Sequence, residues 1–250
     1  MTGRRVAAAF ACVLAMAAPA LAANRDPADL TGVWWPVQPH GSDFKPDPPL
    51  TPAAQKDWDE VRAAMSAGKT VQDSAGSCVP PGTPRLMTRV YPIQWVRYGA
   101  GWVLIHEFEN AVRWIYTDGR KPPAADDVLP AYNGYSIGHW EGRTLVVETS
   151  GFKPTSDTGR QVWIEMGVPV TPQLKLTEKY SLTDAGKGMK VELIMSDPSI
   201  FTRPWVTEKQ FELKTDVEIM EFTCLADENP IEYAPDGSAG FRDFSKPAQK

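Results

Sequence analysis

The chain has 250 residues, of which 42% are hydrophobic, with 31 acidic against 26 basic side chains. A net charge of −5 without any basic run argues against nucleic acid or an anionic membrane surface as a partner. The length is sufficient for one all-β domain with a sizeable core, and a division into two domains is the second possibility.

Residues 1–22 have the pattern of a secretory signal peptide. Arg4 and Arg5 precede an uncharged stretch of 17 residues, 6–22, which ends in Ala20-Leu21-Ala22. The alternative is a membrane anchor, but an anchor needs about 20 apolar residues, and Pro19 interrupts this stretch. We therefore expect cleavage after residue 22, a periplasmic or secreted mature chain, and no membrane partner after cleavage. The mature chain has 24 basic and 31 acidic residues, a net charge of −7.

Two cysteines, Cys78 and Cys224, remain after that cleavage. In an exported protein such a pair usually forms a disulfide. The alternative is a metal site, but His40, His106 and His139 are far apart in the sequence and no Cys-x-x-Cys or His-x-x-x-His spacing occurs. We favour the disulfide and expect neither a metal nor another cofactor.

The mature chain begins with an expected strand at 30–35, followed by a proline-rich loop. One helix is predicted over 52–67, because Thr51 suits the N-cap, Pro52 suits the first helical position and Gly68 follows the last helix former. This is a short N-terminal helix in an otherwise β-rich chain. Its apolar positions recur at helical spacing, so one face is expected to pack against the rest of the protein.

The remaining elements are expected to be strands joined mostly by short turns. The clearest is a hairpin over 134–149, in which Glu141-Gly142-Arg143 forms the tight turn. Further strands are predicted at 93–98, 102–108, 111–116, 162–165, 174–182, 189–196, 207–213 and 217–223. Eight to ten strands without βαβ spacing predict an all-β fold, either an antiparallel up-and-down barrel or a sandwich. We favour the barrel, formed by a single domain over 23–250, because closure leaves no free edge strand.

Three stretches carry family-like motifs: 113–120 (RWIYTDGR), 138–149 (GHWEGRTLVVET) and 197–205 (DPSIFTRPW). Together with Cys78, Pro84 and Cys224 they resemble a poorly characterised family of exported bacterial proteins, over about residues 30–224. The resemblance implies a lipocalin-like barrel but no settled activity, and some relatives are associated with cofactor-free cleavage or decarboxylation of plant-derived aromatic compounds. The family often continues after the second cysteine with a His-Glu-Gly-Asn-like stretch, whereas this chain has LADEN at 225–229.

Alternation along the strands indicates which polar groups face the interior of a barrel. Over 102–108, Trp102 and His106 share one face with two apolar residues, and Glu107 lies on the other. The sequence leaves open which face points inward, and exposure at the rim is the simpler alternative for each polar residue.

Arg113 begins the next strand, within reach of Glu107 or His106 across a short turn. The simpler interpretation is a salt bridge between strands. The alternative is an arginine that binds a substrate carboxylate with both nitrogens, while Tyr116 or His139 donates the proton.

Polar residues on other apolar strands, among them Glu178 and Tyr180, must also face inward or be paired. Pairing with Lys or Arg explains most carboxylates, and Tyr180 is a candidate for binding substrate. Arg203 and Trp205 are expected to be structural and to close one end of the barrel.

Three functions fit these expectations. The first is a cofactor-independent lyase, decarboxylase or isomerase that acts by acid/base chemistry on an apolar or aromatic compound with a carboxylate or phenol. Its catalytic candidates are Tyr116, His106 and His139, and its binding candidates are Arg113, Glu107, Trp102 and Tyr180. The second is a periplasmic carrier of a hydrophobic small molecule, and the third is a structural module of the envelope. The oligomeric state stays open.

Overall fold

The computed structural model describes residues 26, 28–37, 44–69, 71, 73, 75–124, 127–155, 159 and 161–225, together with the backbone of 231–233 and 239–241. The expected signal peptide and the segment 226–229 lie outside the described residues.

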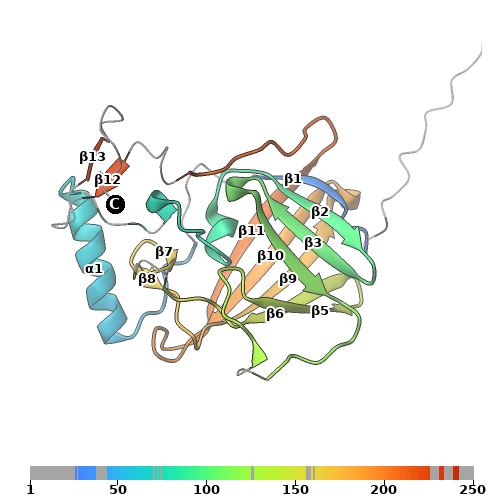
Figure 1. The fold of residues 1–250 in the computed structure, drawn as a ribbon. Helices are drawn as coiled ribbons and strands as arrows, with labels where there is room; N and C mark the ends of the chain where they lie inside the picture. Colours follow the sequence, from blue (N-terminus) through green and yellow to red (C-terminus); the bar gives the residue numbers. More distant parts are fainter. Residues whose placement is uncertain are drawn as a thin grey trace, which may run out of the picture.

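A closed β-barrel of nine strands forms the body of the described chain, which confirms the predicted barrel (Figure 1). In order around the barrel, the strands are β1 (Gly32–Pro36), β11 (Trp205–Lys214), β10 (Gly188–Ser196), β9 (Lys175–Thr183), β6 (Thr144–Ser150), β5 (Tyr135–Glu141), β4 (Ala111–Tyr116), β3 (Gly101–His106) and β2 (Ile93–Tyr98). The predicted hairpin over 134–149 is the β5–β6 pair, and Gly142 in its turn has a φ of 61°.

One pair of neighbours departs from the expected antiparallel barrel, because β4 and β5 run parallel. The connection between them, residues 117–134, is long enough to bring the chain back to the end at which β4 began. Register between the two strands is limited to Ile115 opposite Ser136 and Tyr116 opposite Ile137. The barrel is closed here through only these two residue pairs.

Large aromatic side chains fill much of the barrel interior. Trp34, Trp95, Trp102 and Tyr180 are each at most 1% exposed. Trp95 makes edge contacts with Trp102 and Tyr180, at centroid distances of 5.8 and 4.8 Å. Burial of each such ring contributes several kcal/mol in area terms, so the barrel is held by a packed core.

The helix α1 (Pro52–Ser66) begins as predicted, because the Thr51 hydroxyl accepts a hydrogen bond from the Ala54 amide and Pro52 is the first helical residue. It is not N-terminal, however, since β1 precedes it. Trp58 of α1 packs against Gly167, where an added Cβ would lie 3.1 Å from the indole ring. Figure 1 shows α1 beside the barrel, next to β7 (Trp163–Glu165) and β8 (Val168–Pro169).

Two predicted barrel strands are not part of the barrel. Residues 163–165 pair with β8 in a separate two-stranded sheet, because the chain leaves the barrel after β6. Residues 217–223 form no strand: the Met220 amide donates instead to the Glu107 carboxylate, at 3.0 Å. The other short elements are η1 (Ala75–Ser77), η2 (Arg85–Thr88), η3 (Phe108–Asn110), η5 (Asp184–Gly186), β12 (Ile231–Tyr233) and β13 (Ala239–Phe241).

Trp205 occupies a buried corner, as expected for a structural residue. Its indole nitrogen donates to the Pro46 carbonyl at 2.8 Å, and its ring contacts Phe44 and Phe201. Arg203 is exposed, and Phe44 and Phe201 are the rings packed against Trp205.

Cys78 and Cys224 form a disulfide across 146 residues, with their Cα atoms 5.2 Å apart, which confirms the predicted pair. The bond joins the chain before β2 to the segment that follows β11. A disulfide of this kind is typical of proteins in an oxidising compartment. Within the part of the chain that the structure describes, no helix is long and apolar enough to span a membrane.

Candidate functional site

A buried ion pair lies inside the barrel between β4 and β9. Arg113 donates to both carboxylate oxygens of Glu178, and the Nη1–Oε1 distance is 3.0 Å. Its Nε donates to Ser136 at 2.9 Å and its Nη2 to Thr149 at 2.7 Å. The Tyr180 hydroxyl donates to Glu178 at 2.7 Å. Both prongs of the Arg113 guanidinium are therefore bound to protein groups.

Charge and burial compete in this network. Burial alone would lower the pKa of Arg113, but the adjoining Glu178 carboxylate raises it above its ordinary value. Burial, with the Glu178 charge next in importance, raises the pKa of the Tyr180 phenol well above its usual range. Arg113 and Tyr180 therefore both stay protonated at neutral pH. Glu178, not Glu107, is the partner of Arg113.

His106 also faces the interior, and its side chain is 2% exposed. Burial, followed by the charge of Arg113, lowers its pKa to about 3. Its Nε2 has no hydrogen-bond partner among the described residues. His106 is therefore a neutral imidazole at the pH values where a histidine usually exchanges protons.

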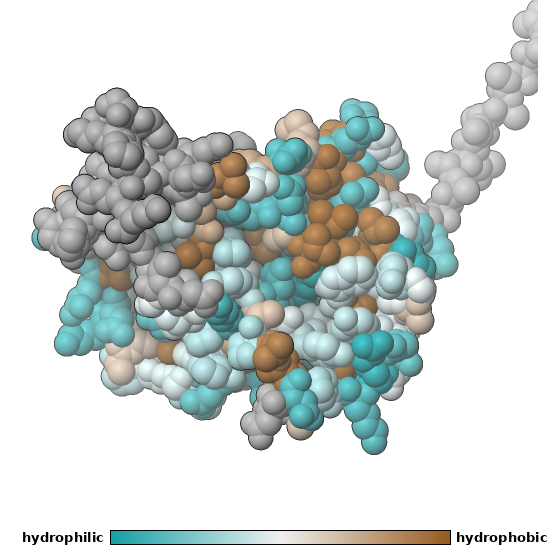
Figure 2. Space-filling view, viewed as in Figure 1, coloured by the Kyte–Doolittle hydropathy of each residue, from teal (hydrophilic) through white to brown (hydrophobic). Residues whose placement is uncertain are grey.

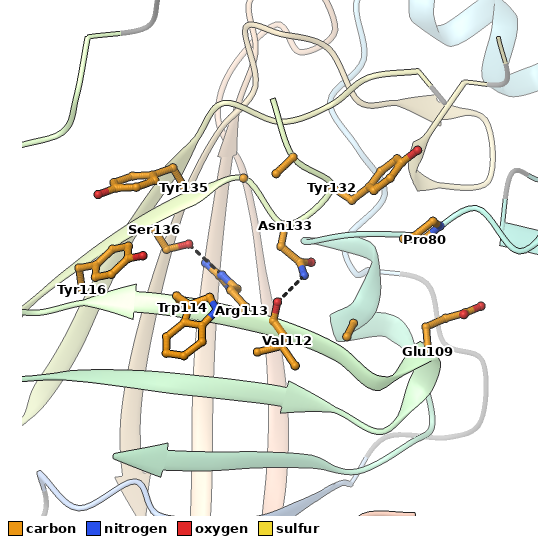
Figure 3. Close-up of a pocket in the computed structure, with 13 residues that line it drawn as sticks. Pro80, Glu109, Val112, Arg113, Trp114, Tyr116, Tyr132, Asn133, Tyr135 and Ser136 are labelled. Atoms are coloured by element: carbon orange, nitrogen blue, oxygen red, sulfur yellow. Dashed lines mark hydrogen bonds between the residues drawn. The ribbon is translucent and has the colours of Figure 1, made fainter. Parts of the chain in front are cut away.

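A cleft of about 390 Å³ opens on the outside of the barrel along the β4–β5 seam (Figure 3). It exists because the two strands pair only near the end of β4, so the beginning of β4 faces the segment 131–134 instead. The lining residues are Pro80, Glu109, Ala111, Val112, Arg113, Trp114, Tyr116, Ala131, Tyr132, Asn133, Gly134, Tyr135 and Ser136. The cleft thus reaches the buried network at Arg113 and Ser136.

Aromatic side chains form much of the cleft wall. Tyr116 and Tyr135 stack with their centroids 5.3 Å apart, and the Arg120 guanidinium lies 3.8 Å from the Tyr116 centroid. Trp114 is 44% exposed on the outer face of β4. Figure 2 shows apolar side chains gathered over β2 and β3, the strands beside this face. A planar apolar molecule would find stacking surfaces here.

Asn133 sets the width of the cleft near its middle. Its side-chain amide donates to the Val112 carbonyl at 3.1 Å and thereby ties the segment before β5 to β4 where the strands themselves do not pair. The following Gly134 has a φ of 62°, and an added Cβ would meet the Ser150 carbonyl at 2.8 Å. Only glycine fits this close approach.

Glu109 lies at the opposite end of the cleft from Tyr116 and Tyr135 (Figure 3). One carboxylate oxygen accepts from the Cys224 amide at 3.3 Å, while the other is buried and has no hydrogen-bond partner in the described chain. Burial raises the pKa of Glu109, and the Cys224 hydrogen bond and the charge of Arg89 offset this only in part. Its backbone is in the left-handed region, with a φ of 64°. A carboxyl that has a raised pKa, lines a cleft and belongs to a residue with a strained backbone is a candidate acid or base.

The other sequence-predicted residues are distributed over three places. Arg113, His106, Tyr180 and Trp102 lie inside the barrel, and Glu107 is 5% exposed and holds the Met220 amide. Tyr116 lines the cleft. His139 is remote from both: its side chain is half-exposed and pairs with Glu141 at 3.2 Å in the β5–β6 hairpin.

Sequence reasoning did not single out Glu109, because Glu109-Asn110 has the composition of an ordinary turn. The signals that distinguish it are its positive φ, its burial by the Cys224 segment and its place at the seam. The hydrogen bond from Cys224 joins residues 115 positions apart, and the seam depends on a long connection between β4 and β5, so neither is visible in the local sequence.

In the described part of the chain, no group of three or more His, Cys, Asp or Glu side chains is arranged to hold a metal ion. The chain matches no known protein-family model, and no curated protein matches it.

Proposed function

We propose that the protein is a periplasmic or secreted barrel that binds an elongated aromatic compound in the β4–β5 cleft and performs cofactor-free proton transfer on it. The reaction class is that of an isomerase or a lyase. The family that the sequence motifs resemble supports this proposal only in a general way. The main support is the cleft itself.

The observation that carries the proposal is a carboxyl of raised pKa at one end of an aromatic-walled cleft. A general base works best when its pKa is close to the working pH, and desolvation moves Glu109 in that direction. The lining of β4 runs from Ala111 to Tyr116, about 16 Å at the usual rise of a strand. A compound longer than a single ring would span this distance.

Each end of the cleft has a distinct role in this proposal. Tyr116 and Tyr135 stack on the ring at one end, and Glu109 takes or returns a proton at the other. Arg113 acts from the floor as a fixed charge, because its two prongs are held by Glu178. Two-pronged binding of a substrate carboxylate by Arg113 would require that this ion pair be broken.

A non-catalytic carrier is the second candidate, and one observation favours it. The polar groups at the floor of the cleft are already hydrogen-bonded to one another, as in a binding site that orients a ligand without transforming it. In the enzyme, Glu109 should determine the reaction rate, whereas in a carrier it can affect only the affinity for the ligand.

The test is a screen of the mature protein against aromatic acids and dimeric phenols, with binding measured by calorimetry and turnover by mass spectrometry. Glu109→Gln keeps the acceptor for the Cys224 amide, so an enzyme should lose about a hundredfold or more in rate and retain affinity. Glu148→Gln, which changes an exposed carboxylate on β6, is the matched control. Binding without turnover in the unaltered protein supports the carrier, and full activity of Glu109→Gln contradicts the catalytic role.

A further inference from the structure

A second pocket, of about 410 Å³, lies between α1, η2 and the end of β7, outside the β4–β5 cleft. It is rich in charge and contains two methionines. Its lining residues are Arg62, Met65, Ser66, Asp73, Arg85, Thr88, Arg89, Glu165 and Met166. Nothing in the proposed reaction uses this pocket.

The charge of Arg85 is already balanced within the protein. Its Nη1 donates to Asp73 at 2.6 Å, and its Nη2 donates to the other oxygen of the same carboxylate. Arg85 is 3% exposed, so this pair is part of the pocket's fixed frame. The charges of Arg85 and Asp73 therefore compensate each other, and neither is available to a ligand.

Arg89, the next arginine along the chain, has no such partner. Its guanidinium lies 5.0 Å from the centroid of the Phe108 ring, and it forms no salt bridge with any described residue. Its Nε is buried and makes no hydrogen bond within the described chain. Burial, and then the charge of Arg85, lower the pKa of Arg89. The carboxylates of Asp73 and Glu109 act on Arg89 without forming a salt bridge with it, and they offset these two effects only in part. A largely buried cation beside another cation is costly unless an anion binds it directly.

The rest of the lining indicates which anion fits. Three arginines face two carboxylates, Asp73 and Glu165, so the pocket has one positive charge in excess. One excess charge suits a monoanion better than a dianionic phosphate. Arg62 stands at the rim, stacked on Trp58 at 4.6 Å, where it can contribute to the same anion.

The volume and the methionines indicate what carries the charge. About 410 Å³ is far more space than a bare carboxylate fills. Met65 and Met166 offer flexible apolar surface for an organic body attached to the anion. We propose that this pocket binds an organic monocarboxylate, with the carboxylate on Arg89 and the apolar body against Met65 and Met166.

The experiment is calorimetric titration of the mature protein with hexanoate and, in parallel, with the uncharged amide hexanamide. Hexanoate should bind saturably, and hexanamide at least about tenfold more weakly, because a hydrogen bond between charged groups is lost. Arg89→Gln should weaken hexanoate by about tenfold or more, and Arg62→Gln by a smaller factor. Arg143→Gln, which removes an exposed arginine in the β5–β6 turn, is the control and should leave the affinity for hexanoate unchanged.

Arg62 is exposed on α1, so its variant tests the site even if Arg89→Gln fails to fold. Equal binding of hexanoate and hexanamide would overturn the proposal, as would the absence of saturable hexanoate binding. Folded Arg62 and Arg89 variants with unchanged affinity would have the same consequence. Arg62 does not line the β4–β5 cleft and is not among the groups that shift the pKa of Glu109, so the Arg62→Gln result is separate from the proposed function.

Discussion

At the scale of single residues, the Arg113–Glu178 pair determines how polar chemistry is arranged inside the barrel. Sequence alternation indicated that Glu178 needs a partner, and that inference is correct. It did not identify the partner, because the two residues lie 65 positions apart and meet across the barrel. The sequence neighbour Glu107 was the natural choice, but the chain turns through η3 directly after it and aims it at the Met220 amide.

Glu178→Gln should lower the free energy of unfolding by about 3–5 kcal/mol, because it leaves Arg113 buried without a counter-charge. Urea unfolding of the variant measures this difference. The double change Arg113→Met with Glu178→Leu removes both charges and should recover much of the loss. A single variant as stable as the unaltered protein would show that the pair is not buried in solution.

His106 makes a separate prediction about pH. Its folded pKa of about 3 lies below the unfolded value of 6.5, so the unfolded chain binds the extra proton. The contribution of His106 to stability is therefore complete above pH 6.5 and is lost as the pH falls from 6.5 towards 3. The full difference amounts to about 5 kcal/mol.

His106→Leu should flatten the fall in unfolding free energy between pH 6.5 and pH 3 relative to the unaltered protein. Chemical unfolding at a series of pH values, with the two proteins side by side, measures the difference. Carboxylates elsewhere titrate in the same range in both proteins and cancel in the comparison. Parallel curves would mean that the imidazole is accessible to solvent.

At the scale of elements, the hairpins were predictable and the long-range pairings were not. Turn residues such as Gly142, and strands of alternating or β-branched character, are local signals, so the β5–β6 hairpin followed from the sequence. The parallel β4–β5 pair depends on the path of the long connection between these two strands, and no local sequence pattern predicts that path. Residues 217–223 look like a strand, but they pair with side chains at η3 and not with a neighbouring strand. The Met220 amide donates to the Glu107 carboxylate and the Phe222 amide to the Asn110 side-chain oxygen.

The Cys78–Cys224 disulfide is expected to affect both the stability of the fold and the geometry of the cleft. Cys224 donates its amide to Glu109, so the bond holds in place the segment that buries this carboxyl. The paired replacement Cys78→Ser and Cys224→Ser should lower the free energy of unfolding by about 4 kcal/mol in the chain-entropy model. It should also lower the pKa of Glu109 towards its ordinary value: the Cys224 hydrogen bond that lowers this pKa would be lost, but burial, which raises it, has the larger effect.

Thermal and urea unfolding measure the first effect, and the Glu109 side-chain carbon shift in NMR titration measures the second. The control is Cys224→Ser alone, kept under reducing conditions so that the remaining Cys78 thiol forms no new disulfide; it breaks the same bond with one fewer substitution. An unchanged Glu109 titration in the paired variant would show that the Cys224 segment stays in place without the disulfide.

At the scale of the whole molecule, the barrel separates a filled interior from a cleft in its wall. Alternation along the strands left open which faces point inward, and the structure places Arg113, His106 and Tyr180 inside the barrel. The interior is packed with tryptophans and its polar groups are satisfied or neutral, whereas the open space lies along the seam. Of the site residues predicted from the sequence as catalytic, Tyr116 lines the cleft. Glu109 was identified as a candidate only from the structure.

The account's central claim is that an aromatic compound binds along the β4–β5 seam rather than inside the barrel. The most direct measurement is a crystal structure of the protein with the aromatic compound that binds most tightly in the screen. We predict a ring against Tyr116 and Tyr135, with the polar end of the compound towards Glu109. A ligand among Trp34, Trp95 and Trp102 in the barrel interior, with the seam empty, would contradict the claim.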